Sequence, residues 1–191
     1  MKITVICSNE NHPVYPYILK WKEKNGSEHS IRIVNKSNEI KNTGDLLFLI
    51  GCTEIISKNL RKNFDKVLNG YNKIPLTLFE INDKIDAGDI WKKTFFNLDG
   101  HELSDEVNHL VSIKTTELMD FALKKFNSIS PIPQDKTTES FFPKRNPSDS
   151  ELDINKSIVE QFNLLRVADK NRYPCFFYHH GYRYKVTIEK Y

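Results

Sequence analysis

The stretch Leu46-Leu-Phe-Leu-Ile50 decides the fold class of this chain. It is a continuous apolar run of strand length, which is typical of a β-strand covered on both faces. A second run, Ile3 to Cys7, is followed by polar residues and then Pro13, a pattern that predicts a strand, a loop and a helix start. The helix is expected to end at Asn25-Gly26, and another strand is expected at residues 31–34. Strand, helix, strand, strand predicts an open α/β sheet.

The pattern is less regular after Ile50. A helix is expected to begin at Thr53 or Ser57, and Val67-Leu68 resembles a strand that breaks off at once in Asn69-Gly70. Two extended segments, 75–80 and 90–98, then flank an acidic loop at residues 86–89. Gly88 is expected to supply a positive φ in that loop.

The C-terminal half divides into a long helix and a separate section. Residues 102–127 carry one apolar stripe with charged residues opposite, which predicts an amphipathic helix. The proline-containing stretch 128–133 ends it and indicates a linker. A helix near 156–167 and two aromatic strands, 175–178 and 182–188, joined by a turn at Gly181, are expected after it. We therefore predict two parts: a Rossmann-like, open and mostly parallel sheet with helices on both faces at 1–130, and a small C-terminal α+β section at 140–191.

Composition narrows the class of protein. The chain has 191 residues, 39% hydrophobic and 28% charged, with a net charge of +3. Its lysines are interleaved with acidic residues, whereas a nucleic-acid binder usually concentrates basic residues on one face. Three cysteines without metal-finger or redox spacing indicate buried thiols in a reducing compartment. The N-terminal run is too short for a signal peptide, and no run reaches membrane-spanning length, so we expect a cytoplasmic protein without a membrane partner.

Two features suggest chemistry, and each also has a structural explanation. Asp86 and Asp89 share one tight loop, where neighbouring carboxylates raise one another's pKa and suit proton transfer, although an Asp-x-Gly turn commonly caps its own backbone. His12 lies in the loop after the first strand, at the edge where open α/β sheets bind ligands. Because it precedes Pro13, it is also suited to capping the helix. No histidine pair has metal-ligand spacing, and the loop after the first strand lacks the glycines of a phosphate loop.

Three stretches together resemble the formyltransferases that use formyltetrahydrofolate. This family includes methionyl-tRNA formyltransferase, glycinamide ribonucleotide transformylase and the sugar N-formyltransferases. Residues 45–56 resemble the strand and turn that line the pterin pocket, and residues 74–90 resemble the folate-binding loop. Residues 142–154, with 163–167 and 173–177, resemble the small C-terminal section of the sugar and tRNA enzymes.

The resemblance implies a site with formyltetrahydrofolate as co-substrate. It implies that Asp86 is the catalytic residue of the folate loop and that Ser8 and Asn9 face the substrate. It further implies a pterin pocket whose two walls are formed by Asp83, Lys84 and Ile85 on one side and by Glu54, Ile55 and Ile56 on the other. We expect Asp86 to lie at the C-terminal edge of the sheet, close to Ser8 and to residues 52–56.

One part of the family pattern is missing. The family places Asn-x-His at the end of a central strand, followed by a loop and a helix, and nothing between Leu60 and Ile74 matches this. Relative to the family, a block is missing between Leu68 and Asn69. We expect either a wide gap between these two residues, or bonded residues in a sheet whose strand is absent or rebuilt from Asp65 to Leu68; an intact sheet with a continuous backbone here would contradict both. The implied function is formyl transfer to the amine of a nucleotide-linked amino sugar, by a chain that can form a homo-oligomer. The alternatives are a methionyl-tRNA formyltransferase-like enzyme and a non-catalytic folate- or nucleotide-binding remnant.

Overall fold

The computed structural model describes residues 1–41, 43–53, 64–70, 76–82, 87–135 and 146–191. The chain divides into two compact units. The first comprises Met1–Phe96 and Asn108–Lys136, and the second comprises Asn97–Val107 and Thr137–Tyr191. Residues 97–107 thus belong with the C-terminal unit, and the division expected at 130–140 stays a prediction.

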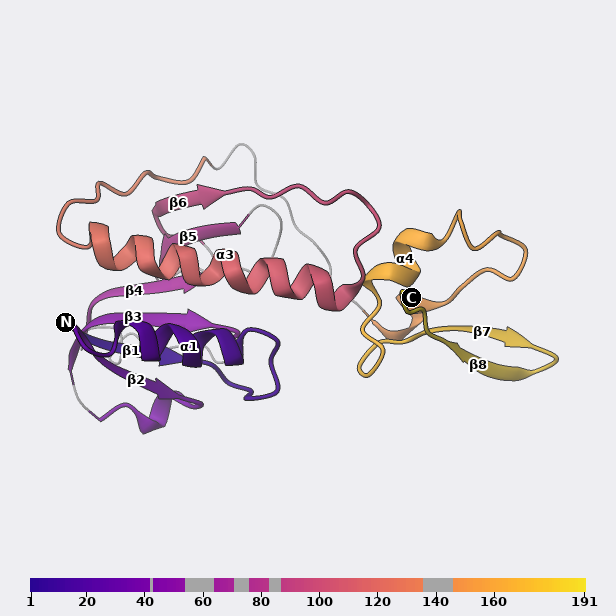
Figure 1. Cartoon of the computed structure of the whole chain (residues 1–191), viewed down its shortest axis with the longest axis horizontal. Coiled ribbons are helices and arrows are strands. Elements are labelled where there is room, and N and C mark those ends of the chain that lie inside the picture. Colours follow the sequence, from indigo (N-terminus) through magenta and orange to yellow (C-terminus); the bar gives the residue numbers. More distant parts are fainter. Residues whose placement is uncertain (42, 54–63, 71–75, 83–86, 136–145) are drawn as a thin grey trace. The chain divides into compact units, whose positions relative to one another are not determined.

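A six-stranded sheet forms the centre of the first unit (Figure 1). Its strands stand in the order β2-β1-β3-β4-β5-β6; the pairs β2–β1, β1–β3 and β3–β4 are parallel, whereas β4–β5 and β5–β6 are antiparallel. The α/β class and the mostly parallel sheet are as predicted. The bounds are β1 Lys2–Ile6, β2 Ser30–Val34, β3 Gly44–Ile50, β4 Phe64–Gly70, β5 Leu76–Glu80 and β6 Ile90–Thr94, with a 3-10 turn, η1, at Ser37–Glu39.

Strand β3 is buried on both faces, as its apolar run predicts. Leu46 to Ile50 are each at most 4% exposed. Phe48 contacts the Trp21 ring of helix α1 (Tyr15–Asn25), so its face of the sheet is the one that α1 covers. On the opposite face, Leu47 and Leu49 form a cluster with Ile6 and Val34, against which Ile40, Cys52 and Ile81 pack. A helix covering that face would fall in residues 54–63, outside the described ranges.

Helices α1 and α3 (Ser104–Lys125) lie side by side in the first unit, and one carboxylate joins them (Figure 1). Asp120 of α3 accepts hydrogen bonds from the indole N–H of Trp21 at 2.6 Å and from the ammonium group of Lys24 at 2.6 Å. Trp21 is only 3% exposed, so its N–H depends on this acceptor. Among the described helices, none combines the length and apolarity needed to cross a membrane.

Replacing this acceptor is expected to destabilise the first unit. Asp120→Ala leaves the buried indole N–H of Trp21 without its partner, a loss of about 1–3 kcal/mol in the free energy of unfolding. Asp120→Asn keeps a side-chain carbonyl oxygen and should lose less. Urea unfolding followed by tryptophan fluorescence measures both variants, and equal stability of Asp120→Ala and wild type would contradict the role of this contact.

Strand β4 is the part of the sheet that the sequence pattern described least well. It continues through Leu68, Asn69 and Gly70, so the expectation that the strand breaks off at Asn69-Gly70 is wrong. Leu68 pairs with Phe48 and Asn69 with Leu49, so the wide gap is not found, and the strand covers Phe64–Gly70 rather than the Asp65–Leu68 expected of a rebuilt strand. Asparagine and glycine are poor strand formers, but partners on both sides hold them here.

The second unit contains short elements and a hairpin. Helix α4 covers only Phe162–Val167, so the helix expected from residue 156 is shorter than predicted. The reason is local. Asp153 Oδ1 accepts the backbone N–H of Asn155, and the Glu160 carboxylate accepts the backbone N–H of Ser157. These side-chain acceptors take the place of helical hydrogen bonds and favour turns before residue 162. The hairpin β7 (Cys175–His179) and β8 (Tyr182–Val186) turns at Gly181, whose φ of +81° confirms the predicted role. A 3-10 turn, η3, covers Pro147–Ser150.

Candidate functional site

The carboxyl ends of the parallel strands bring together the segments that follow β1 and β3. Ser8 donates its backbone N–H to the carbonyl oxygen of Gly51 at 3.3 Å, and its hydroxyl accepts the N–H of Thr53 at 3.1 Å. Asn9 follows and is exposed. Ser8 therefore lies at the ligand edge of the sheet, where the family resemblance implies the substrate side. Its contact with substrate stays a prediction.

His12 also lies at this edge, held by two contacts. Its Nδ1 accepts the backbone N–H of Val14, the N-cap residue of α1, at 3.2 Å; α1 has no side-chain cap hydrogen bond, so the expected capping of the helix by His12 is wrong. Its ring also lies against Gly51: the Cδ2, Cγ and Nε2 atoms are 3.1, 3.2 and 3.2 Å from where a Cβ would stand at that residue. Sequence reasoning did not predict this second contact, because it joins residues from two strands. The available signal was a glycine directly after the central strand.

Gly51 is required at this position for two reasons. Its φ is +60°, in the left-handed region that favours glycine, and a side chain would press on the His12 ring. Gly51→Ala is therefore expected to destabilise the first unit by about 1–2 kcal/mol, from backbone strain, and to displace the His12 ring. Chemical denaturation measures the first effect, and the histidine ring signals in an NMR spectrum report the second. A variant of wild-type stability with unmoved ring signals would contradict this account.

Seven of the predicted site residues fall outside the described ranges. They are the proposed catalytic residue and the two proposed walls of the pterin pocket: Asp86, Asp83, Lys84, Ile85, Glu54, Ile55 and Ile56. Their described neighbours are informative, however. Cys52 precedes one wall and Ile81 precedes the other, and both pack against the cluster that contains Leu47 and Leu49. The described residues that lead into the two predicted walls thus pack on the same face of the sheet.

The direction of β5 determines where the acidic loop begins. Leu78 pairs with Gly70 and Glu80 with Leu68, so β5 runs away from the end of β4. The five residues between β4 and β5 allow this hairpin-like reversal, whereas a parallel crossover needs a dozen or more. Asn82 and Ala87, joined by a 2.7 Å hydrogen bond, therefore lie toward the N-terminal edge of the parallel strands, away from Ser8. The place of Asp86 itself lies outside the described residues.

Gly88 has a different role from the one predicted. Its φ lies outside the left-handed region, so the expectation of a positive φ is wrong. A Cβ at Gly88 would stand 1.6 Å from the carbonyl oxygen of Glu80, whose own N–H donates to the carbonyl oxygen of Asp89. Glycine is required here because two backbone segments touch.

Two further clusters contain potentially reactive groups. Cys7 and Cys175 are buried and Cys52 is half-buried, and none of the three forms a disulfide; burial raises the pKa of the Cys7 thiol, which keeps it protonated. In the second unit, Asp99, His101 and Glu102 have ligand atoms within 4.8 Å of one another. Hydrogen bonds from the backbone N–H groups of Asp99 and Gly100 lower the pKa of Glu102 to about 2, so its carboxylate serves the turn before α3.

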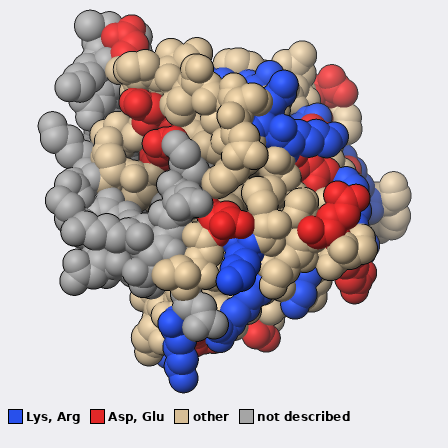
Figure 2. Space-filling model, turned by 90° about the vertical axis from the view of Figure 1, so that its left-hand side faces the viewer, with Lys and Arg blue, Asp and Glu red and all other residues tan. Residues whose placement is uncertain are grey.

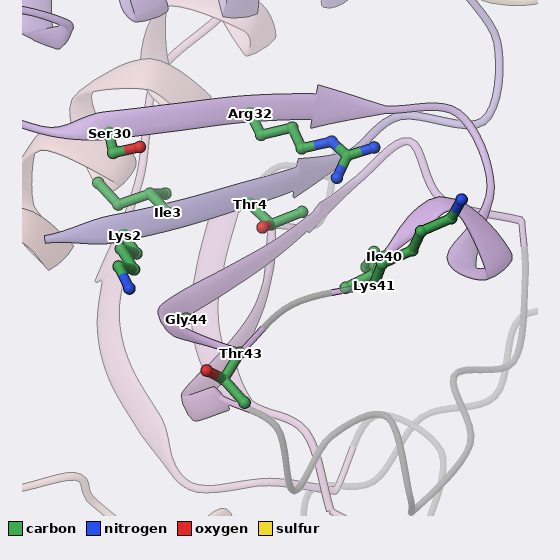
Figure 3. A pocket seen from close by; sticks show the side chains of 9 residues that line it. All are labelled: Lys2, Ile3, Thr4, Ser30, Arg32, Ile40, Lys41, Thr43 and Gly44. Atoms are coloured by element: carbon green, nitrogen blue, oxygen red, sulfur yellow. The ribbon is translucent and has the colours of Figure 1, made fainter.

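A hollow of about 520 Å³ lies away from the ligand edge (Figure 3). It is bordered by residues of β1, of β2 and of the segment between η1 and β3: Lys2, Ile3, Thr4, Ser30, Arg32, Ile40, Lys41, Thr43 and Gly44. These residues include the starts of three strands, the end opposite to Ser8 and His12. On the face that Figure 2 shows, basic and acidic side chains are interspersed, as the sequence predicts for a solvated surface.

No protein-family model matches the chain. In sequence it is similar to the methionyl-tRNA formyltransferases of Pseudothermotoga lettingae, with 31% identity over 127 residues, and Streptococcus agalactiae, with 28% over 102 residues. These matches cover 64% and 52% of this chain but 41% and 33% of the relatives, so the chain spans well under half of their length.

Solved structures share the fold over almost the whole chain. A methionyl-tRNA formyltransferase from Clostridium thermocellum has a TM-score of 0.78 at 17% identity, covering 98% of this chain and 92% of that one. A 4-N formyltransferase from Francisella tularensis has a TM-score of 0.75 at 19% identity, with 98% and 97% covered. A formyltransferase from Anoxybacillus kamchatkensis (TM-score 0.56, 15% identity, 71% and 82% covered) was solved with a UDP-linked formamido sugar and tetrahydrofolate. The chain thus has the fold of these formyltransferases and is similar in sequence to methionyl-tRNA formyltransferases over 52–64% of its length.

Proposed function

We propose that this chain transfers a formyl group from formyltetrahydrofolate to the amine of a nucleotide-linked amino sugar. The observation that carries the proposal is the sequence relationship to formyltransferases, 31% identity over 127 residues, in a chain of the same fold. The described residues are compatible with a pterin pocket, because Cys52 and Ile81 start its two predicted walls from one core cluster. The thiols of Cys7, Cys52 and Cys175, none of them in a disulfide, support a cytoplasmic location.

An amino sugar is favoured over methionyl-tRNA as the acceptor. A tRNA-binding surface gains affinity from concentrated positive charge, but this chain has a net charge of +3 and intersperses its charges on the face seen in Figure 2. Structural coverage does not separate the two acceptors, because the Francisella tularensis 4-N formyltransferase is matched over 97% of its length and the Clostridium thermocellum methionyl-tRNA formyltransferase over 92%. Ser8 and Asn9 would face the sugar.

A second candidate is a folate- or nucleotide-binding protein without catalysis. The specific observation in its favour is the direction of β5, which carries Asn82 and Ala87 away from the edge that holds Ser8. The Asn-x-His pattern is also missing from the sequence of β4.

Two measurements separate these candidates. A reduced folate should raise the melting temperature, because a ligand that binds only the folded state stabilises it by mass action. Formation of a formamido sugar should then be assayed by mass spectrometry, with formyltetrahydrofolate, a panel of nucleotide-linked amino sugars, and methionyl-tRNA as the competing acceptor. Folate binding without any product would favour the second candidate, and absence of both would contradict the two proposals.

A further inference from the structure

We propose that the hollow at the starts of β1, β2 and β3 binds the phosphoryl group of a small organic phosphate. Three cationic side chains border it, those of Lys2, Arg32 and Lys41, together with the hydroxyl groups of Thr4 and Ser30. The hollow lies at the opposite end of the parallel strands from the ligand edge. The inference therefore does not depend on the proposed function.

The first observation is a change in character along one face of the sheet. Register partners in a parallel pair share a face, and here Lys2 pairs with Ser30 and Thr4 with Arg32. Ile6, two residues after Thr4 on the same face, is fully buried in the core cluster. Parallel strands are usually apolar on both faces, so core packing does not account for cations and hydroxyls here. Toward the strand starts, the face is built from polar groups that border the hollow.

The second observation is the balance of charge. None of the described residues that border the hollow is acidic. In the described part of the chain, the charged groups of Lys2, Arg32 and Lys41 form neither an ion pair nor a hydrogen bond. The carboxylate of Asp45 is directed to backbone, because it accepts the N–H of Lys2 at 2.8 Å. Three cations against one carboxylate leave an excess of positive charge, which favours an anionic ligand.

The third observation is the kind of donors. A guanidinium group binds phosphate through parallel N–H donors, an ammonium group adds a point charge, and hydroxyl groups donate to the remaining oxygens. Arg32, the two lysines, Thr4 and Ser30 provide this set (Figure 3). The volume of about 520 Å³ falls within the range of small-molecule sites, about 300–1,000 Å³. Ile3 and Ile40 also border the hollow, so the organic part of the ligand has apolar side chains to contact.

A small molecule is favoured over the phosphate backbone of a nucleic acid. A nucleic-acid binder clusters basic residues along a whole face or helix. The face seen in Figure 2 instead carries interspersed basic and acidic side chains. The basic groups counted here border a single hollow, which suits one phosphoryl group.

Ligand titrations followed by backbone amide NMR signals test the site. Inorganic phosphate and adenosine 5′-monophosphate are the two probes, added at constant ionic strength because salt screens exposed charges. We expect the signals of Thr4, Arg32 and Gly44 to shift saturably, with tighter binding of adenosine monophosphate. The signals of Ser8 and Gly51 report on the ligand edge, so binding there is read separately.

Substitutions then assign the binding to the cations of the hollow. Arg32→Gln removes the guanidinium group of an exposed side chain, so it should leave the melting temperature unchanged and raise Kd for adenosine monophosphate about tenfold or more. Arg32→Lys keeps the charge but not the paired donors, and its Kd should be intermediate. Lys41→Gln, which lies outside the strands, should also raise Kd. Lys20→Gln removes the same charge from an exposed residue of α1 and is the matched control, with Kd unchanged.

Four results would overturn the proposal. They are unmoved signals at Thr4, Arg32 and Gly44 with adenosine monophosphate, binding of inorganic phosphate alone, equal Kd values for Arg32→Gln and Lys20→Gln, and shifts caused only by single-stranded RNA. Each of them would leave the proposed formyl transfer intact, because that activity is assayed by its product.

Discussion

Gly88→Ala is expected to destabilise the first unit more than Gly51→Ala does. The added Cβ would stand 1.6 Å from the carbonyl oxygen of Glu80 and 2.5 Å from its carbonyl carbon, distances that no rotamer change can relieve. The two backbone segments must separate, and with them the end of the β5–β6 pairing at Phe79 and Ile90. Overpacking of this kind commonly lowers the free energy of unfolding by about 1–3 kcal/mol. Because the clash here is with backbone atoms, we expect a loss of about 3 kcal/mol or more.

Such a loss is large beside the roughly 5–15 kcal/mol that stabilises a typical domain. For a chain of this size it corresponds to a melting temperature lower by about 6–12 °C. Gly51→Ala is the matched control, because its added methyl meets the movable ring of His12 rather than backbone. Thermal unfolding measures the melting temperatures of both variants. If Gly88→Ala were as stable as Gly51→Ala, the close approach of the two segments would be wrong.

Much of the sheet could be predicted from the sequence, because it is encoded locally. The apolar run of β3 and the β-branched run of β1 each predict a buried strand, as the structure shows. The ends of α1 and of the β7–β8 hairpin follow from glycines at residues 26 and 181. These signals depend on neighbours in the chain, so they need no knowledge of the fold.

The features that were mispredicted depend on pairing between distant segments. Asn69 and Gly70 extend β4 because β3 and β5 supply hydrogen-bond partners on both sides. Gly88 is required by contact with Glu80, eight residues earlier, rather than by its own φ. Local preference gives no sign of either. The seating of His12 against Gly51 is of the same kind, and it appears only when the ends of β1 and β3 are brought together.

The direction of β5 also connects the sequence pattern with the chemistry. A catalytic histidine strand followed by a loop and a helix would leave enough chain for a crossover, but here β4 and β5 are joined by residues 71–75 alone. A connection this short gives an antiparallel neighbour. Ser8 and His12 therefore stand at one edge of the sheet, while Asn82 and Ala87 stand toward the other.

Asp86→Asn tests the role that the family resemblance implies for the acidic loop. If Asp86 acts as the family resemblance implies, its loss should lower kcat by about 10²–10⁴-fold, the usual range for a general acid–base group.

Asp86→Asn keeps the size of the side chain and removes its charge, so a loss of that size would support an acid–base role for this carboxylate. Asp89→Asn, which changes an exposed carboxylate of the same loop, is the matched control for altered charge. Steady-state kinetics of these two variants give the comparison. Wild-type kcat in Asp86→Asn would contradict the role that the family resemblance implies.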